Sequence, residues 1–74
     1  QLVPHPNNGR FFIRMTEGSP DLVQLSDGTG RLLHSWLSPQ ENTLFDAGML
    51  PTGLYFVKIW KNGASIRAKC LIVQ

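Results

Sequence analysis

Cysteine is almost absent from this 74-residue sequence, which contains Cys70 alone. One thiol excludes an internal disulfide and supplies too few ligands for a structural zinc site. A chain of this length buries only about 60% of the surface that its unfolded form exposes. Its stability therefore has to come from sheet hydrogen bonds and from packing of its apolar residues, which are 42% of the total. We expect a single domain over residues 1–74, without a metal or cofactor, excised from a longer protein because it begins with Gln1 rather than Met.

Charged residues are also scarce, at 16% of the sequence against roughly 25% in ordinary globular domains. The seven basic and five acidic residues are scattered and give a net charge of +2, so no block of like charge marks a nucleic-acid-binding or membrane-binding surface. No stretch of 18 apolar residues is present, and we expect no direct insertion into a membrane. Because few charges cover its surface, the domain should expose apolar side chains to a partner.

What the sequence does contain is a clear β-hairpin at its end. Leu54–Lys61 and Ala64–Val73 are rich in strand-forming residues, and Asn62-Gly63 lies between them. A type I′ turn needs positive φ at both central residues, which Asn and Gly tolerate best. We therefore predict a two-stranded hairpin over this whole segment.

Shorter strands with turn signals between them fill the rest of the chain. No helix is predicted, because the best candidate, 32–37, is short, follows a glycine-rich turn and is closed by Pro39. The predicted fold class is an all-β, immunoglobulin-like antiparallel β-sandwich of about six or seven short strands. Before the final hairpin we expect an extended lead-in over 1–9, strands over 10–15, 21–27, 31–37 and 43–46, and a loop over 16–20.

The residues of a strand alternate between its two faces, and this alternation predicts a core face and an outer face. The predicted core face of the first hairpin arm carries Tyr55, Val57 and Ile59. The opposite face carries an apolar interaction patch of Leu54, Phe56 and Trp60. Residues that likewise alternate with the best core candidates elsewhere are Phe12, Leu22, Leu32 and Trp36. The alternative is that the strand register differs or that loops cover these side chains.

Motifs for catalysis or nucleic-acid binding are weak. Cys70 with His5 or His34 is the only conceivable nucleophile pair, and no third orienting group accompanies it. A lone cysteine in an alternating strand is most often a small buried hydrophobic residue, so we predict no enzyme activity. The segment 58–61, Lys-Ile-Trp-Lys, is basic and aromatic, but without a second such block it fits a solvated hairpin end better than a nucleic-acid site.

Three sequence blocks, taken together, resemble a known family. The first is a proline-spaced turn, a glycine and a strand over 3–13, and the second is a strand, an Asp, a glycine turn and a returning strand over 23–33. The third is the hairpin that starts with Leu50-Pro51-Thr52-Gly53-Leu54-Tyr55 and ends in Lys69-Cys70-Leu71-Ile72-Val73-Gln74. In this order and at this spacing, the blocks are similar to the C-terminal sorting domain (Por secretion tail) of type IX secretion cargo proteins of Bacteroidetes.

The resemblance implies a non-catalytic C-terminal secretion signal. The cargo would fold in the periplasm, and this domain would direct it through the outer-membrane type IX translocon to the cell surface or the extracellular space. The implied partners are translocon and shuttle components and a sortase-like surface peptidase, which typically removes the domain and joins the cargo to surface lipopolysaccharide. A second copy of the domain is a further candidate partner. The alternative function is a retained, uncleaved β-sandwich domain that docks its parent protein to a surface or periplasmic sensor partner.

The residues expected to carry recognition lie in the third block. Gly53 and Tyr55 have a structural interpretation, in which Gly53 takes positive φ in a turn and Tyr55 packs in the core, and a functional one, in which the hairpin surface is recognised. For the tail we favour function, because a free strand end can pair with a receptor by β-augmentation and Lys69 adds a charged contact. The expected recognition residues are Leu50, Pro51, Gly53, Tyr55, Lys69, Leu71, Ile72, Val73 and Gln74.

Overall fold

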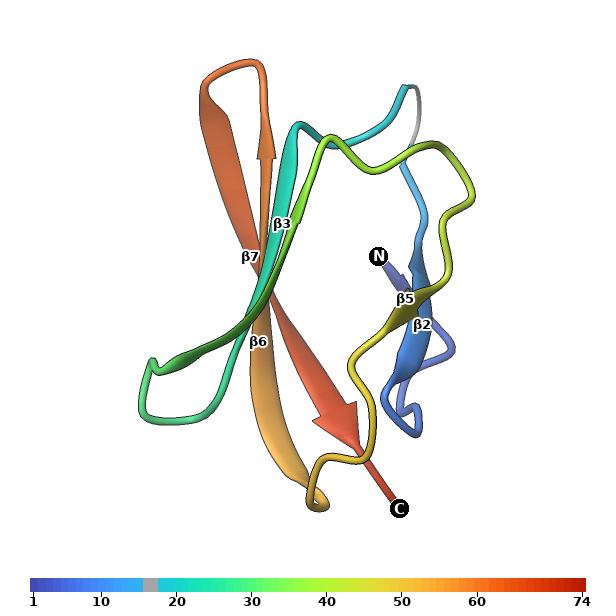
Figure 1. Ribbon diagram of the computed structural model, residues 1–74, viewed down its shortest axis with the longest axis vertical. Coiled ribbons are helices and arrows are strands. Elements are labelled where there is room, and N and C mark those ends of the chain that lie inside the picture. The colour runs from blue at the N-terminus through green and yellow to red at the C-terminus, as the bar shows by residue number, and fades with distance from the viewer. Residues whose placement is uncertain (16–17) are drawn as a thin grey trace.

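The computed structural model describes residues 1–15 and 18–74, and this part of the chain forms seven β-strands and no helix. The strands are β1 (Leu2–Val3), β2 (Arg10–Ile13), β3 (Leu22–Ser26), β4 (Leu32–Leu37), β5 (Phe45–Asp46), β6 (Gly53–Lys61) and β7 (Ala64–Ile72). They pair into two antiparallel sheets, β1-β2-β5 and β4-β3-β6-β7 (Figure 1). The described residues include no helix that is long and apolar enough to span a membrane. The predicted all-β sandwich is confirmed.

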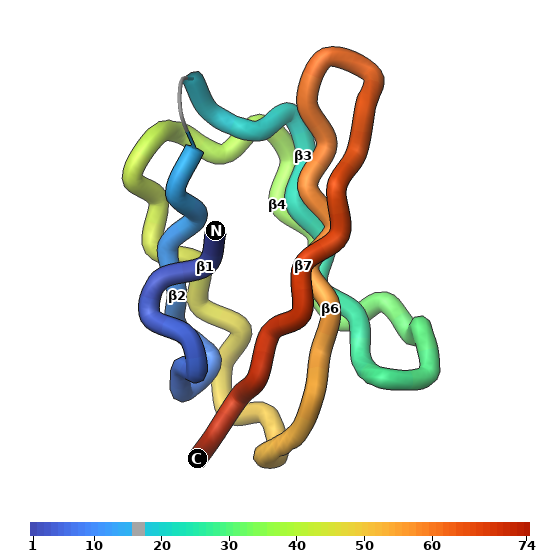
Figure 2. The backbone as a smooth tube through the Cα atoms, turned by 180° about the vertical axis from the view of Figure 1, so that it is seen from behind, coloured from blue at the N-terminus to red at the C-terminus, as the bar shows by residue number. Residues whose placement is uncertain are grey.

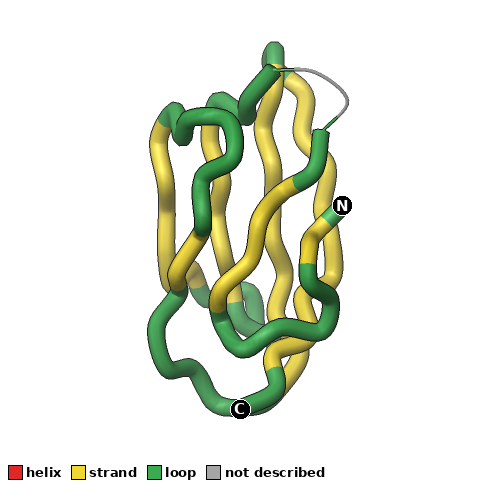
Figure 3. The backbone as a smooth tube through the Cα atoms, turned by 90° about the vertical axis from the view of Figure 1, so that its right-hand side faces the viewer, coloured by secondary structure: helices red, strands yellow, loops and turns green. Residues whose placement is uncertain are grey.

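The two sheets lie face to face as the two layers of the sandwich (Figures 1 and 3). If the strands are lettered A to G in chain order, the sheets are A-B-E and D-C-F-G. A constant-type immunoglobulin domain instead places strand D beside strand E. In this chain β4 pairs with β3, so the four-stranded sheet has β4 at one edge and β7 at the other.

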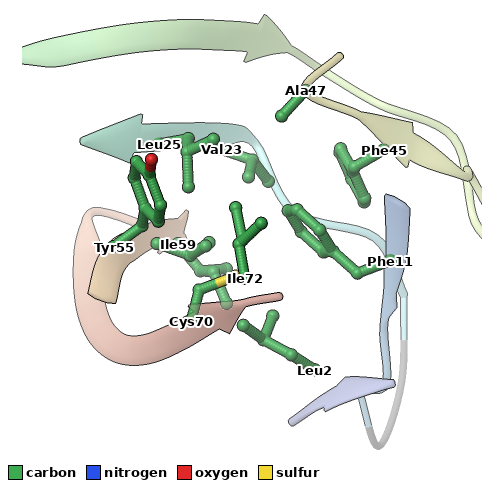
Figure 4. Close-up of a cluster of buried hydrophobic side chains, with 11 residues drawn as sticks. Leu2, Phe11, Val23, Leu25, Phe45, Ala47, Tyr55, Ile59, Cys70 and Ile72 are labelled. Atoms are coloured by element: carbon green, nitrogen blue, oxygen red, sulfur yellow. The ribbon is translucent and has the colours of Figure 1, made fainter. Parts of the chain in front are cut away.

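The core lies between the two layers and takes side chains from both sheets (Figure 4). Phe11 of β2 and Phe45 of β5 stack with their ring centroids 5.5 Å apart. Facing them, the predicted core residues Tyr55, Val57 and Ile59 of β6 are all buried. Alternation therefore predicted the core face of β6 correctly, and Phe45 is buried with these residues.

The final hairpin pairs without interruption, from Gly53 opposite Ile72 to Lys61 opposite Ala64. Asn62 and Gly63 join the two strands with φ angles of 52° and 79°, as the predicted type I′ turn requires. Because the register never shifts, the side chains alternate strictly between the two faces along the whole hairpin. In β6 the odd-numbered side chains lie on the face toward the core. In β7 the even-numbered ones do, although Ala64 and Ile66 lie near the turn and are exposed.

The prediction for β4 is wrong at Trp36. Leu32 and Trp36 were expected to share the face opposite the core, because they are an even number of residues apart. Leu33 has no partner on β3, and this bulge reverses the alternation between the two positions. Leu32 is 51% exposed, whereas Trp36 turns inward and packs against Phe45 with ring centroids 5.2 Å apart. Phe12, as expected, lies away from the core.

The lead-in contains a strand that the sequence did not reveal. Leu2–Val3 pairs with the second half of β2 at the edge of the three-stranded sheet, and the side chain of Leu2 is buried. Two residues before a proline carry no periodicity that could indicate a strand. The strand expected over 10–15 ends at Ile13, and Thr16 and Glu17, part of the loop expected over 16–20, lie outside the described residues.

Candidate recognition surface

The C-terminal tail lies beside the N-terminal lead-in (Figure 2). Asn7 forms a parallel bridge with Ile72: its N–H donates to the carbonyl of Leu71 at 3.0 Å, and its carbonyl accepts from the N–H of Val73 at 2.8 Å. The N–H of Leu71 donates to Nε2 of His5 at 3.1 Å. The outward N–H and carbonyl of Leu71 and the N–H of Val73 are thus already paired inside the domain.

Side-chain contacts complete this junction. Nε2 of Gln74 donates to the carbonyl of Asn8 at 3.1 Å. The side chain of Asn7 is buried; its Oδ1 accepts from the N–H of Gly9 at 2.9 Å, and its Nδ2 donates to Sγ of Cys70 at 3.5 Å. We call this junction of residues 5–8 with residues 70–74 the terminal clasp.

The prediction that the tail ends in a free, unpaired strand is therefore wrong. Pairing of a receptor with Leu71 and Val73 needs backbone groups that the terminal clasp already uses. The side chains of the tail fall into a buried group and an exposed group. Those of Cys70 and Ile72 are completely buried. Those that reach the surface belong to Lys69, Leu71, Val73 and Gln74.

A hydrogen bond from Tyr55 holds the segment before β6. Its hydroxyl donates to the carbonyl of Pro51 at 2.6 Å, while its ring is buried. This is the geometry of the tyrosine corner, which immunoglobulin-like sandwiches have near the start of strand F. It confirms the expected core position of Tyr55. The positive φ expected for Gly53 is wrong, because Gly53 lies outside the left-handed region and begins β6 as an ordinary strand residue opposite Ile72.

The expected apolar patch lies on the outer face of the four-stranded sheet, but cations cover two of its three residues. The guanidinium of Arg67 lies 4.0 Å from the ring centroid of Phe56, and the ammonium of Lys58 lies 4.6 Å from that of Trp60. Both rings are half-buried, and Leu54 is exposed. Cation–π contact changes the character of this surface from apolar to cationic and aromatic. We call it the cationic face, formed by Phe56, Lys58, Trp60, Arg67 and Lys69.

Cys70 is a core residue and is not positioned for nucleophilic catalysis. Its side chain is completely buried, and burial raises the pKa of its thiol. Within residues 1–15 and 18–74, neither histidine hydrogen bonds to it: His5 accepts from Leu71, and Nε2 of His34 lies 3.0 Å from the carbonyl of Ala47. The same part of the chain contains no group of three His, Cys, Asp or Glu side chains that could hold a metal ion.

Sequence reasoning missed the residues that hold the tail. His5 and Asn7 were assigned to a turn, and their partners lie more than 60 residues away, at Leu71 and Cys70. No local pattern could have indicated such pairs. The position of Arg67 carried a usable signal, because the Asn-Gly turn fixes the hairpin register and hence which residues of β7 stand beside Phe56.

Comparison with known protein families matches residues 1–74 to the secretion system C-terminal sorting domain. The curated proteins compared with the chain include no match. The family match spans both sheets, the lead-in and the tail, and so contains all three blocks on which the resemblance rests. This is a family of sorting signals and not of catalysts. The chain belongs to the secretion system C-terminal sorting domain family, the type IX sorting signals that direct export across the outer membrane toward the cell surface or the extracellular space.

Proposed function

We propose that the type IX machinery reads residues 1–74 as one folded domain, after the cargo has entered the periplasm and folded there. The observation that supports this is the terminal clasp. Leu71 and Val73, which the resemblance implicates in recognition, have their backbone groups bonded to the lead-in. An extended, unfolded tail would instead offer those groups to any receptor strand. The signal is then a surface of the sandwich and not a linear peptide.

The expected recognition residues take two roles in this proposal. Tyr55 and Ile72 are buried and act by maintaining the fold, and the half-buried Leu50 packs against the same core. Gly53 acts in the same way, as the first residue of β6. The members that offer exposed side chains to translocon and shuttle components are Pro51, Lys69, Leu71, Val73 and Gln74.

On the cell surface, a sortase-like peptidase removes the domain and joins the cargo to lipopolysaccharide. The domain contributes no chemical group to that step. Its one thiol, at Cys70, is buried under Asn7 and has a raised pKa. The peptidase therefore supplies the nucleophile, and the domain is the leaving segment.

A reporter fusion tests the central proposal. Residues 1–74 are joined to a periplasmic reporter in a type IX host, beside an isogenic strain without the translocon. Export of the reporter in the first strain and periplasmic retention in the second are expected. The variant Val57→Asp, which places a charge in the core, should abolish export because the folded surface is lost. Normal export of that unfolded variant would contradict reading of the folded form, and retention of the wild-type fusion would contradict the sorting function.

The second candidate is a retained, uncleaved domain that docks its parent protein to a surface or periplasmic sensor partner. The cationic face supports it, because aromatic and arginine side chains are enriched in protein–protein interfaces. Intact-mass measurement of the mature parent protein separates the two functions. Loss of residues 1–74 with an anchor attached supports the sorting route, and their presence supports the retained domain.

A further inference from the structure

We propose that the outer edge of β7, at Ser65, Arg67 and Lys69, is a docking site for an extended acidic segment of a partner protein. The segment adds a fifth strand to the four-stranded sheet. This inference rests on the proposed function, because it names the chemistry of a partner that reads the folded signal. β7 is the last strand of its sheet, so among residues 1–15 and 18–74 no strand of the sheet pairs with its outer edge.

The pairing register shows which backbone groups of β7 point away from β6. Leu71 directs its N–H and its carbonyl outward, to His5 and Asn7. Since β6 and β7 pair without a shift, every second residue before Leu71 repeats that direction. These residues are Lys69, Arg67 and Ser65. Their outward N–H and carbonyl groups have no hydrogen-bond partner in the part of the chain that the structure describes.

The chain itself shows that this edge accepts a strand. The terminal clasp occupies its C-terminal part, through the parallel bridge between Asn7 and Ile72. The clasp ends where His5 meets Leu71. The remaining edge, Ser65–Lys69, has about the length of an ordinary short strand, which is what β-augmentation requires.

The charges beside the edge select an acidic segment. No strand of the four-stranded sheet contains Asp or Glu. Lys58, Arg67 and Lys69 are all exposed on its outer face, and every second side chain of an added strand would lie beside Arg67 and Lys69 at cross-strand distance. On the other face the added strand would meet Ile66, which is 63% exposed. The partner segment therefore alternates acidic with apolar residues.

One acidic residue, Asp27, does lie near these cations, but its side chain accepts hydrogen bonds from its own turn. Asp27 lines a hollow of about 240 Å³ together with Lys58 and Arg67. Oδ1 of Asp27 accepts from the hydroxyl of Thr29 at 2.7 Å and from the N–H of Arg31 at 3.0 Å. Oδ1 of Asp27 is thus committed to its own turn, and within the described residues no ion pair joins Asp27 to Lys58 or Arg67.

The same charges disfavour a second copy of this chain as the occupant. Two β7 edges in antiparallel contact would place Arg67 and Lys69 against the cations of the other copy. Like charges opposite each other destabilise a sheet, and lysine on an edge strand is a common means of preventing self-pairing. Pairing of this edge with a second copy of itself is therefore disfavoured, whereas pairing with an acidic strand is favoured.

Titration of the ¹⁵N-labelled 74-residue chain with the capped peptide Ser-Glu-Val-Glu-Val-Glu-Ser tests the edge directly. At millimolar peptide, the amide signals of Ser65, Arg67 and Lys69 should shift and their hydrogen exchange should slow, while the clasped amide of Leu71 stays unchanged. The same peptide with Lys in place of Glu should give no shift. In Arg67→Glu/Lys69→Glu the Glu peptide should bind about tenfold more weakly, and the Lys peptide should now bind. Absent shifts, or equal responses to both peptides, would overturn the proposal.

Export of the reporter fusion tests the edge in cells and separates it from the proposed function. Ser65→Pro removes an outward N–H without breaking a bond to β6, and Arg67→Glu/Lys69→Glu reverses the charge. Each should lower export about tenfold, at unchanged melting temperature, if the edge fixes the partner. The matched controls Ser65→Ala and Arg14→Glu/Arg31→Glu, the latter at exposed positions off β7, should export normally.

The outcomes can be told apart. If the wild-type fusion stays in the periplasm, the proposed function fails. If the wild type and both edge variants are exported equally, the acidic-strand inference fails and the sorting function stands. If sedimentation shows a dimer of the wild-type chain that Ser65→Pro dissociates, the occupant is a second copy and the inference is overturned.

Discussion

The hydroxyl of Tyr55 lies 2.6 Å from the carbonyl oxygen of Pro51, four residues earlier in the chain. Tyr55→Phe removes this hydrogen bond and leaves the packing of the ring intact. The free energy of unfolding should fall by about 1 kcal/mol, the usual net contribution of one hydrogen bond. For a domain of this size that corresponds to a melting temperature lower by about 4–8 °C, measured by circular dichroism. A variant that melts with the wild type would show that the corner is held by packing alone.

Two neighbouring asparagines provide a matched test of the terminal clasp. Asn7→Ala removes the amide that contacts Sγ of Cys70 and leaves the buried N–H of Gly9 without an acceptor, which should lower the free energy of unfolding by about 1–3 kcal/mol. Asn8→Ala removes only an exposed acceptor of the Arg10 N–H and should cost less than about 0.5 kcal/mol. Urea denaturation of both variants measures the difference. Equal losses at the two positions would show that the clasp does not stabilise the domain.

Three glycines should differ in their tolerance of alanine. Gly9→Ala should be the most damaging, because the new Cβ would lie 2.6 Å from the carbonyl oxygen of Gly48 at a φ of +102°. Gly63→Ala has open space around it but a φ of +79°, and should lower the free energy of unfolding by about 1–2 kcal/mol. Gly53→Ala meets nothing closer than 3.8 Å and has no positive φ, so it should be close to neutral. A different order in urea denaturation would contradict these backbone assignments.

Acid should weaken the domain partly through Asp27. The hydroxyl of Thr29, and then the backbone N–H groups of Arg31 and Thr29, hold the pKa of this carboxyl below its usual value of 3.8. A lowered folded-state pKa means that the ionised group stabilises the fold above pH 3.8, and that this contribution is lost as the pH falls through the folded pKa. Between about pH 6 and about pH 2, the melting temperature of Asp27→Asn should therefore vary less than that of the wild type. Identical pH profiles would exclude this contribution.

Alkylation reports on the burial of Cys70. Because its side chain is completely buried and its thiol pKa is raised, iodoacetamide should modify the folded chain at least about tenfold more slowly than the chain in urea. Asn7→Ala, which removes the amide over the sulfur, should react faster than the wild type. Asn8→Ala is the control and should react at the wild-type rate. Equal rates in the folded and unfolded chains would show that the thiol is accessible.

The sequence was sufficient to predict which two segments pair in the final hairpin and which face of β6 lies toward the core. Alternation at Tyr55, Val57 and Ile59 depends only on the strand itself, and the Asn-Gly turn fixes the register of the partner strand. The bulge at Leu33 could not be predicted in the same way. It depends on how β4 meets β3, and one unpaired residue moved Trp36 from the expected outer face into the core.

The recognition surface was predicted in composition but not in geometry. Lys69 and Leu71 are exposed as a recognition role requires, yet no pattern within the tail reveals that His5 and Asn7 occupy its backbone groups. Likewise, the apolar residues of the outer face were identified, but Arg67 reaches Phe56 from the other arm of the hairpin. Contacts between distant segments decided what remained accessible in both places.

The terminal clasp also orders events in time. Cys70 and Ile72 place completely buried side chains in the core from the last strand, and a ribosome makes them after every other core residue. Until they are joined to the chain, Asn7 lacks the strand that it bridges and the core lacks two of its completely buried side chains. A nascent protein whose synthesis stops before β7 should therefore lack a folded sorting domain. If the type IX machinery reads the folded surface, as we propose, it should not export chains whose synthesis stops before β7.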